Sequence, residues 1–163
     1  MELMTITAGM ILSMFMNMAE DNRDNGFVYN ADLDGNKVAT LYCYHANAEG
    51  TCISNNKKDH FVYDQQNRVV AKETFRWNEL SEAWEPVSRM DYSYTNLSTC
   101  IDYAAWNAST QSFDSCKERF VYEGVANHVF NVKQYVKDTK SGEFLLADSF
   151  LLMGDAKKLL ADK

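Results

Sequence analysis

Proline is almost absent from this chain of 163 residues, which contains only Pro86, and glycine occurs just seven times. With aromatic residues at 13%, this composition excludes collagen-like chains and argues against intrinsic disorder. No cluster of lysine or arginine is present and the formal net charge is −7, so we expect no nucleic-acid partner. No catalytic signature is recognisable, and we therefore expect neither a cofactor nor enzymatic activity.

A long apolar run is also missing, because residues 3–16 are fewer than the roughly 20 that a membrane-spanning helix needs. We expect no transmembrane span in the mature chain. The run ends at Asn17-Met18-Ala19-Glu20, and this pattern is typical of a secretory signal peptide over residues 1–19. No lysine or arginine precedes it, which leaves a packed N-terminal helix as the alternative. The sequence thus predicts a secreted, periplasmic or cell-surface protein whose residues 20–163 form a single β-repeat domain.

A short aromatic or apolar triplet recurs along the chain at intervals of 34, 31, 28 and 30 residues. Its five copies are Phe27-Val28-Tyr29, Phe61-Val62-Tyr63, Tyr92-Ser93-Tyr94, Phe120-Val121-Tyr122 and Phe150-Leu151-Leu152. A further aromatic residue follows each of the first four copies by 12 to 15 residues. Self-similarity at a near-fixed period predicts one supersecondary unit used repeatedly, and here the turn-like spacers make that unit a β-hairpin.

The predicted fold is all-β, an antiparallel meander of about nine strands built from these hairpins. We expect strands over 25–30, 37–46, 51–64, 68–78, 83–95, 99–107, 112–123, 128–137 and 143–153. Short connections favour pairing between sequence neighbours. A sheet of this length needs to hide one apolar face, so we expect it to curl into an open barrel or to fold on itself. A short C-terminal helix is predicted from Gly154, with Asp155 as its N-cap.

Alternation in the second hairpin assigns its two faces. The predicted dry face carries Val69, Ala71, Glu73, Phe75 and Trp77, and the wet face carries Lys72, Thr74, Arg76, Glu85, Arg89 and Asp91. Trp77 is expected opposite Trp84 on the partner strand. One face in core and one in water is the usual state of an antiparallel sheet.

Four cysteines give a further indication of compartment. If the pairing of the second hairpin transfers to the first, Cys43 faces Cys52 at a distance that a disulfide can span. Cys100 and Cys116 also share one hairpin, although the odd position of Phe113 and the even position of Phe120 require a β-bulge between them. Two local bridges would suit an oxidising compartment. Four reduced thiols are the alternative.

Two groups of residues have the donor atoms of a metal site. The oxygens of Asn30, Asp32 and Asp34 have the spacing of a calcium loop, but its twelfth position is Leu41 and Asp34-Gly35 is a hairpin-turn dipeptide. We therefore expect a turn there. Zinc at Cys43, His45 and Cys52 lacks an evident fourth ligand. The other histidines, His60 and His128, lie in different repeats and are expected to be surface or turn residues, so we predict no metal.

The best candidates for function are aromatic residues beside the turns of successive units, where they would line up along one edge. They are Tyr44, Trp77, Trp84, Trp106 and Tyr135. Exposed rows of such rings stack on sugars and on partner side chains. The alternative is that these large rings form the core.

The segment Tyr63-Asp64 … Arg68-Val69 resembles the tyrosine-aspartate repeat of large secreted bacterial proteins, with Asn67 in place of the usual glycine. The whole layout over residues 25–153 is similar to a family of small secreted β-repeat proteins of unknown function from Bacteroides-type bacteria. That resemblance implies export and a β-repeat fold, and it supplies no activity.

From these observations we predict a non-enzymatic binding module in the cell envelope or outside the cell, with a glycan or an envelope protein as its partner. A structural, self-assembling protein is the second hypothesis, because strands 25–30 and 143–153 would be free edges. A glycan-active hydrolase that uses an unrecognised carboxylate pair is the third.

Overall fold

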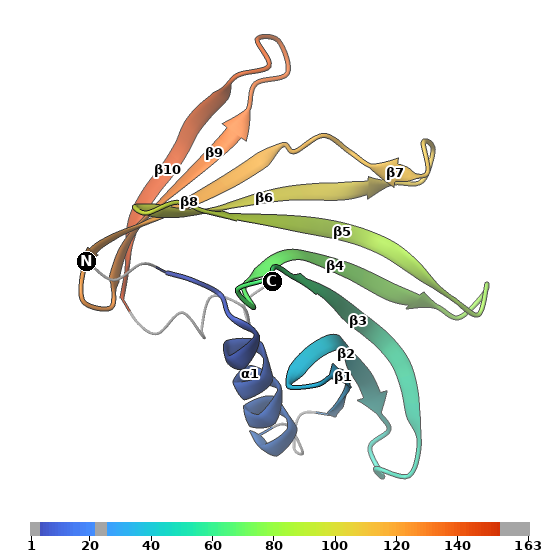
Figure 1. Cartoon of the computed structure of the whole chain (residues 1–163). Helices are drawn as coiled ribbons and strands as arrows, with labels where there is room; N and C mark the ends of the chain where they lie inside the picture. Colours follow the sequence, from blue (N-terminus) through green and yellow to red (C-terminus); the bar gives the residue numbers. More distant parts are fainter. Residues whose placement is uncertain (1–3, 22–25, 154–163) are drawn as a thin grey trace. The chain divides into compact units, whose positions relative to one another are not determined.

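The computed structural model describes residues 4–21 and 26–153 (Figure 1). This part contains one helix, α1 (Ala8–Asp21), and ten strands. The strands are β1 (Phe27–Asp34), β2 (Lys37–Ala46), β3 (Ile53–Tyr63), β4 (Val69–Asn78), β5 (Ala83–Tyr94), β6 (Ser98–Asn107), β7 (Ser112–Phe113), β8 (Glu118–Ala126), β9 (Val129–Lys137) and β10 (Phe144–Met153). The fold is mostly β, as predicted.

Strand order follows chain order. It runs β1-β2-β3-β4-β5-β6-β8-β9-β10, with the short β7 paired to β6, and the pairs whose register is defined are antiparallel. The antiparallel meander is thus confirmed. Within the described residues β1 and β10 end the order and do not pair with each other, so the sheet is not closed. The predicted helix from Gly154, with Asp155 as its cap, lies outside the described residues.

Two strand boundaries differ from the prediction. The first strand continues to Asp34 instead of ending at residue 30, because Asp34 pairs with Lys37 across a two-residue turn whose Gly35 has a φ of 59°. The strand predicted over 112–123 is divided into β7 and β8. Trp106 pairs with Phe113 and Tyr103 with Glu118, so three steps along β6 correspond to five along its partner. The predicted irregularity between residues 113 and 120 is therefore present, as a break in the strand.

The chain forms two compact units whose boundary falls within β5. Unit 2 comprises Thr7–Ser88, and unit 1 comprises Met1–Ile6 with Arg89–Lys163. The N-terminal segment thus contributes to both units, because Met4 and Ile6 belong to unit 1 and α1 belongs to unit 2.

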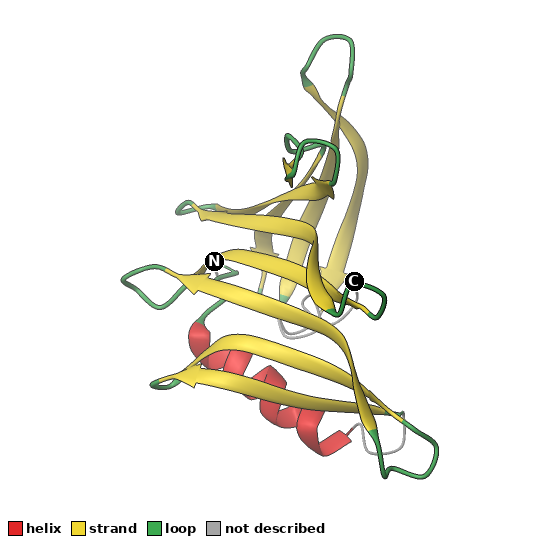
Figure 2. Cartoon of the chain, turned by 90° about the vertical axis from the view of Figure 1, so that its right-hand side faces the viewer, coloured by secondary structure: helices red, strands yellow, loops and turns green. Residues whose placement is uncertain are grey.

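In unit 2, helix α1 packs on β1 and β2, and Figure 2 shows it running along these strands. Thr7 caps the helix, its Oγ1 accepting the N–H of Met10, and the N–H of Ala8 donates to the carbonyl of Asn67 at 2.8 Å. Ile11 and Val38 are fully buried. Residues 8–21 therefore adopt the packed-helix alternative in this structure, and removal of residues 1–19 as a signal peptide stays a prediction. Among the described residues, no helix is long and apolar enough to span a bilayer.

The burial of residues on β4 differs from the predicted division into a dry and a wet face. Lys72 was expected in water, yet it is only 7% exposed, because it sits directly opposite the buried Phe61 on β3. Burial lowers the pKa of Lys72, and the charge of the nearby, equally buried Asp59 opposes that shift. Asp59 accepts a hydrogen bond of 2.6 Å from Thr74. Conversely, Phe75 on the predicted dry face is half-exposed.

The core of unit 1 is built where the N-terminal segment meets the last strands. Met4, Phe130 and Val132 form a buried cluster, and the half-buried residues packed against it are Phe120, Tyr122 and Leu152. The hydroxyl of Thr99 donates to the carbonyl of Met4, which ties β6 to the N-terminal segment. Residues distant in sequence are thereby held together within this unit.

Candidate functional site

A row of two aromatic side chains and one lysine crosses three neighbouring strands of unit 2. Tyr42 on β2 pairs with Lys58 on β3, and Lys58 pairs with Phe75 on β4. Directly paired residues of antiparallel strands project from the same face of the sheet. The register therefore places these three side chains in one line across the sheet.

Three ring contacts extend this row into a connected surface. The ring centroid of Tyr42 lies 6.1 Å from that of Tyr44 and 6.3 Å from that of Trp84. Trp84 meets Trp77 edge to face at 5.3 Å, an arrangement favoured by the ring quadrupoles. We refer to these six side chains as the aromatic surface: Tyr42, Tyr44, Lys58, Phe75, Trp77 and Trp84. All six are intermediate in exposure, so each ring is anchored by its neighbours and still reaches solvent.

Lys58 is the cation of this surface. Its Nζ lies 5.1 Å from the ring centroid of Phe75 and 5.0 Å from that of Trp84, both within the range of a cation–π contact. Two rings thus hold the ammonium group among aromatic neighbours, where it remains a hydrogen-bond donor.

Polar groups border the rings. The hydroxyl of Tyr42 donates to Oδ2 of Asp32 at 2.9 Å, and this hydrogen bond to a carboxylate raises the pKa of Tyr42. Beside the two tryptophans, Nδ2 of Asn78 donates to Oε1 of Glu85 at 2.7 Å. Carboxylate and amide oxygens next to exposed rings are groups that hydrogen-bond to sugar hydroxyls.

The predicted platform is brought together only in part. Tyr44, Trp77 and Trp84 belong to the aromatic surface, and the expected meeting of the two tryptophans is confirmed. Trp106 and Tyr135 belong to unit 1. Trp106 contacts Phe113 at 5.1 Å, and Tyr135 lies on β9 opposite Arg119 and Leu146. Trp106 and Tyr135 are therefore not part of the aromatic surface, and the predicted row of five aromatic residues is present only as the other three.

Sequence reasoning missed Tyr42, Phe75 and Lys58 as members of the surface. Tyr42 and Phe75 each stand two residues before a predicted member, so alternation along a strand could have found them. Lys58 had no such signal, because its place depends on the register between β2 and β3.

The four cysteines are free thiols, in place of the two predicted bridges. The expected facing of Cys43 and Cys52 is wrong, because Cys43 pairs with Lys57. The N–H of Asn47 bonds to the carbonyl of Cys52 and closes the turn at those two residues, so Cys43 lies four residues away from its end. Cys100 pairs with Val121 on β8 and is likewise not opposite a cysteine.

The thiols of the second predicted bridge, Cys100 and Cys116, lie beside an ion pair. Asp102 and Arg119 form two hydrogen bonds across β6 and β8, and Sγ of Cys100 is 3.7 Å from Oδ1 of Asp102. Burial, reinforced by the charge of Asp102, raises the pKa of both thiols. Raised thiol pKa values disfavour the nucleophilic thiolate, so this cluster has the character of a structural site.

None of the metal candidates forms a site in the part of the chain that the structure describes, where no group of three or more possible ligands from His, Cys, Asp and Glu converges. Asn30 uses its Oδ1 to accept the N–H of Ala31, and Asp32 accepts from Tyr42. The hairpin turn that the sequence predicted is present, with Asp34 as the last residue of β1 and Gly35 and Asn36 as the two residues of the turn. The ring of His45 packs edge to face against the ring of Phe27.

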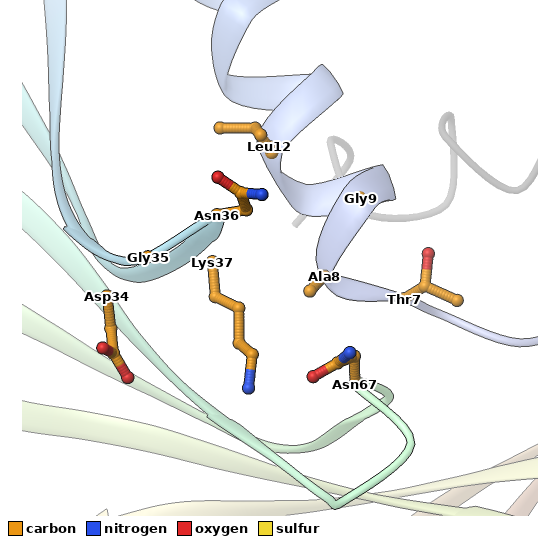
Figure 3. Close-up of a pocket in the computed structure, with 9 residues that line it drawn as sticks. All are labelled: Thr7, Ala8, Gly9, Leu12, Asp34, Gly35, Asn36, Lys37 and Asn67. Atoms are coloured by element: carbon orange, nitrogen blue, oxygen red, sulfur yellow. The ribbon is translucent and has the colours of Figure 1, made fainter.

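A pocket of about 560 Å³ lies in unit 2 between the first turn of α1 and two hairpin turns (Figure 3). Five of the residues that line it have polar side chains, and Lys37 is the one basic residue among them. Its nine lining residues are Thr7, Ala8, Gly9, Leu12, Asp34, Gly35, Asn36, Lys37 and Asn67. Four of these nine fall within residues 1–19, so the pocket exists only where that segment is retained. No residue of the aromatic surface falls within that segment, which makes this surface the stronger candidate.

A family model described as a family of unknown function, DUF3836, matches residues 1–124. The chain belongs to the DUF3836 family. A solved structure of a protein of unknown function from Bacteroides fragilis is similar to it, with a TM-score of 0.66 and 25% identity over 78% of this chain and 94% of that one. No curated protein matches.

Two solved members of the DUF3836 family are also similar. The protein from Bacteroides vulgatus has a TM-score of 0.53 and 26% identity, covering 55% of this chain and 90% of that one. The protein from Parabacteroides distasonis has a TM-score of 0.54 and 17% identity, covering 60% and 89% respectively, and shows the fold alone. The predicted relationship to an uncharacterised family of Bacteroides-type bacteria is confirmed. The likeness of residues 63–69 to tyrosine-aspartate repeats stays a prediction.

Proposed function

We propose that this DUF3836 protein is an exported, non-enzymatic binding module whose aromatic surface binds a glycan. The observation that carries the proposal is the connected set of four contacting rings, Tyr42, Tyr44, Trp77 and Trp84, held half-exposed on one unit. Rings fixed by their neighbours lose little conformational entropy when a ligand stacks on them.

The groups around the rings favour a sugar over a purely apolar partner. Sugar rings present C–H faces that stack on aromatic rings, and hydroxyls that need hydrogen-bond partners at the rim. Asp32, Asn78 and Glu85 supply such partners here. Lys58 adds a cation that would also pair with the carboxylate of an acidic sugar. Export is supported by the apolar run over residues 3–16.

The proposal is tested by titrating the purified protein with soluble oligosaccharides, both neutral (from cellulose, xylan and starch) and uronate-containing. Binding is followed by calorimetry and by tryptophan fluorescence. Replacing a stacking ring by alanine removes about 1–3 kcal/mol, so Trp84→Ala is expected to weaken binding roughly 10- to 100-fold. Trp106→Ala is the matched control, because Trp106 is the third tryptophan and belongs to the other unit.

Circular dichroism and urea unfolding of each variant separate loss of binding from loss of fold. A protein that binds no member of the panel contradicts the proposal. So does a folded Trp84→Ala variant with the affinity of the wild type.

A further inference from the structure

Strand β10 is exposed to an unusual degree. It ends the strand order, and within residues 4–21 and 26–153 its one partner strand is β9. Most of its large apolar side chains face solvent, with exposed fractions of 55% for Leu145, 57% for Leu146, 66% for Leu151 and 77% for Met153. Soluble proteins normally protect a long apolar edge strand, because its unpaired N–H and C=O groups accept another strand.

The usual protective devices are sparse along β10. Among residues 144–153 there is no lysine, arginine or proline, and Asp148 is the one charged residue. A β-bulge at Ala147 interrupts the pairing with β9 between Leu146 and Asp148. One charge and one bulge are therefore the protective features of this ten-residue edge strand.

The bulge makes the apolar residues symmetric about Ser149. Ser149 pairs with Lys133 on β9, while Leu146 pairs with Tyr135 and Leu151 with Asn131. Each leucine is thus two ladder positions from Ser149, because Ala147 takes no position. The next positions outward hold Leu145 and Leu152, then Phe144 and Met153.

The hydrogen bonding at Ser149 fits a free edge. Its main-chain N–H donates to Oδ1 of Asp148 at 2.8 Å. The strand at the other end of the order has the same arrangement, where the N–H of Ala31 donates to Oδ1 of Asn30 at 2.9 Å. In a single copy these N–H groups are thus satisfied by a local side chain, and the N–H of Ser149 is available to another strand once it leaves Asp148.

We propose that β10 pairs antiparallel with β10 of a second copy of this chain, about a two-fold axis through Ser149. A two-fold interface must be self-complementary, and this register meets that requirement. Leu151 faces Leu146 of the second copy, and the outer positions bring further apolar side chains opposite one another. Asp148 falls opposite Phe150 of the second copy, so no two like charges meet. The two sheets become one continuous sheet across the axis.

This inference is independent of glycan binding, because β10 belongs to unit 1 and the aromatic surface to unit 2. Sedimentation velocity of the full chain over a range of concentrations tests it. The wild type is expected to sediment as a dimer and Leu151→Lys as a monomer, since the substitution puts a charge opposite leucine. Leu80→Lys is the matched control, because Leu80 is 98% exposed in the turn between β4 and β5. A wild type that stays monomeric at every concentration overturns the proposal, and so does a Leu80→Lys variant that dissociates equally.

A cross-link tests the register. Directly opposed residues of antiparallel strands have Cα atoms about 4.5–5.5 Å apart, within disulfide range. Ser149→Cys is therefore expected to form a covalent dimer in a glutathione redox buffer, in which glutathione disulfide accepts the two electrons. Ser141→Cys, in the exposed turn before β10, is the control and is expected to form no covalent dimer. Mass spectrometry of the linked peptides should place the bridge between the substituted position of one copy and the same position of the other. A dimer linked equally through Ser141→Cys, or none through Ser149→Cys, contradicts the two-fold axis.

Discussion

Asp102 on β6 and Arg119 on β8 are directly paired and joined by two hydrogen bonds, from Nε to Oδ1 at 2.6 Å and from Nη2 to Oδ2 at 2.7 Å. Fork-to-fork contacts of this kind are the stronger form of ion pair. Arg119 also stacks at 4.4 Å on the ring of Phe144 in β10, so the pair links three strands of unit 1.

The first prediction concerns acid stability. Hydrogen bonding to Arg119 holds the pKa of Asp102 below its ordinary value of 3.8. A lowered pKa in the folded state means that the contribution to stability is complete above that ordinary value and is lost as pH falls through the folded value. Asp102→Asn should lower the free energy of unfolding at pH 7 by about 1 kcal/mol, a discounted figure because the two side chains are 29% and 36% exposed.

Urea unfolding at pH 7 and pH 3 measures this effect. The difference between wild type and Asp102→Asn should shrink at the lower pH. Asp91→Asn, which removes the more exposed partner of Arg89, is the control and should change stability by less. An undiminished difference at pH 3 would show that packing, and not the charge of Asp102, is responsible.

The second prediction concerns the turn before β4. Asn67 has a φ of 59°, in the left-handed region where a Cβ costs about 1 kcal/mol. Asp64 organises the turn by accepting the N–H groups of Gln66 and Arg68 at 2.9 Å. Asn67→Gly should therefore be more stable than Asn67→Ala by about 1 kcal/mol in thermal or urea unfolding.

The same pair of substitutions at Gln66 provides the control. Gln66 does not have a positive φ, so its alanine variant should be at least as stable as its glycine variant. If the glycine variant were more stable than the alanine variant at both positions, the backbone explanation would be contradicted.

The third prediction concerns thiol reactivity. Cys52 is exposed, whereas burial raises the pKa of the thiols of Cys100 and Cys116. Iodoacetamide at pH 8, followed by mass spectrometry of peptides, should label Cys52 first. The thiolate fraction of the other two falls about tenfold for each unit by which the pKa rises. Unreduced protein from its native host should show four labelled thiols. A mass two daltons below that of the reduced chain for each unlabelled pair of cysteines would contradict this prediction and support the disulfides that the sequence suggested.

The sequence was sufficient for most strand limits, because alternation and turn dipeptides are local signals. It also placed Trp77 beside Trp84. It failed for Cys43 and Cys52, since the side chain of Asn47 shapes their turn by accepting the N–H groups of Thr51 and Cys52, and a bulge follows at Cys43 and Tyr44. Registers differ from one hairpin to the next for such local reasons.

Burial was harder to predict than secondary structure. Lys72 occupies an alternating position typical of a solvated residue, and only its pairing with Phe61 reveals that the face is covered. Lys58 was likewise hidden as a member of the candidate site, because it reaches two rings through a register that composition does not specify. The division into two units separates Trp106 and Tyr135 from the other predicted rings, and no linker in the sequence marks that boundary.

A meander in which every strand joins the next has a kinetic consequence. Each hairpin joins two strands that are neighbours in the sequence, so closing it costs little loop entropy and folding can begin in any of them. The bond from Thr99 to Met4 is the contrary case, because 95 residues separate its ends. We expect the N-terminal segment to dock last, onto hairpins that have already folded. A chain that loses this segment would then retain its folding route and give up only the final step.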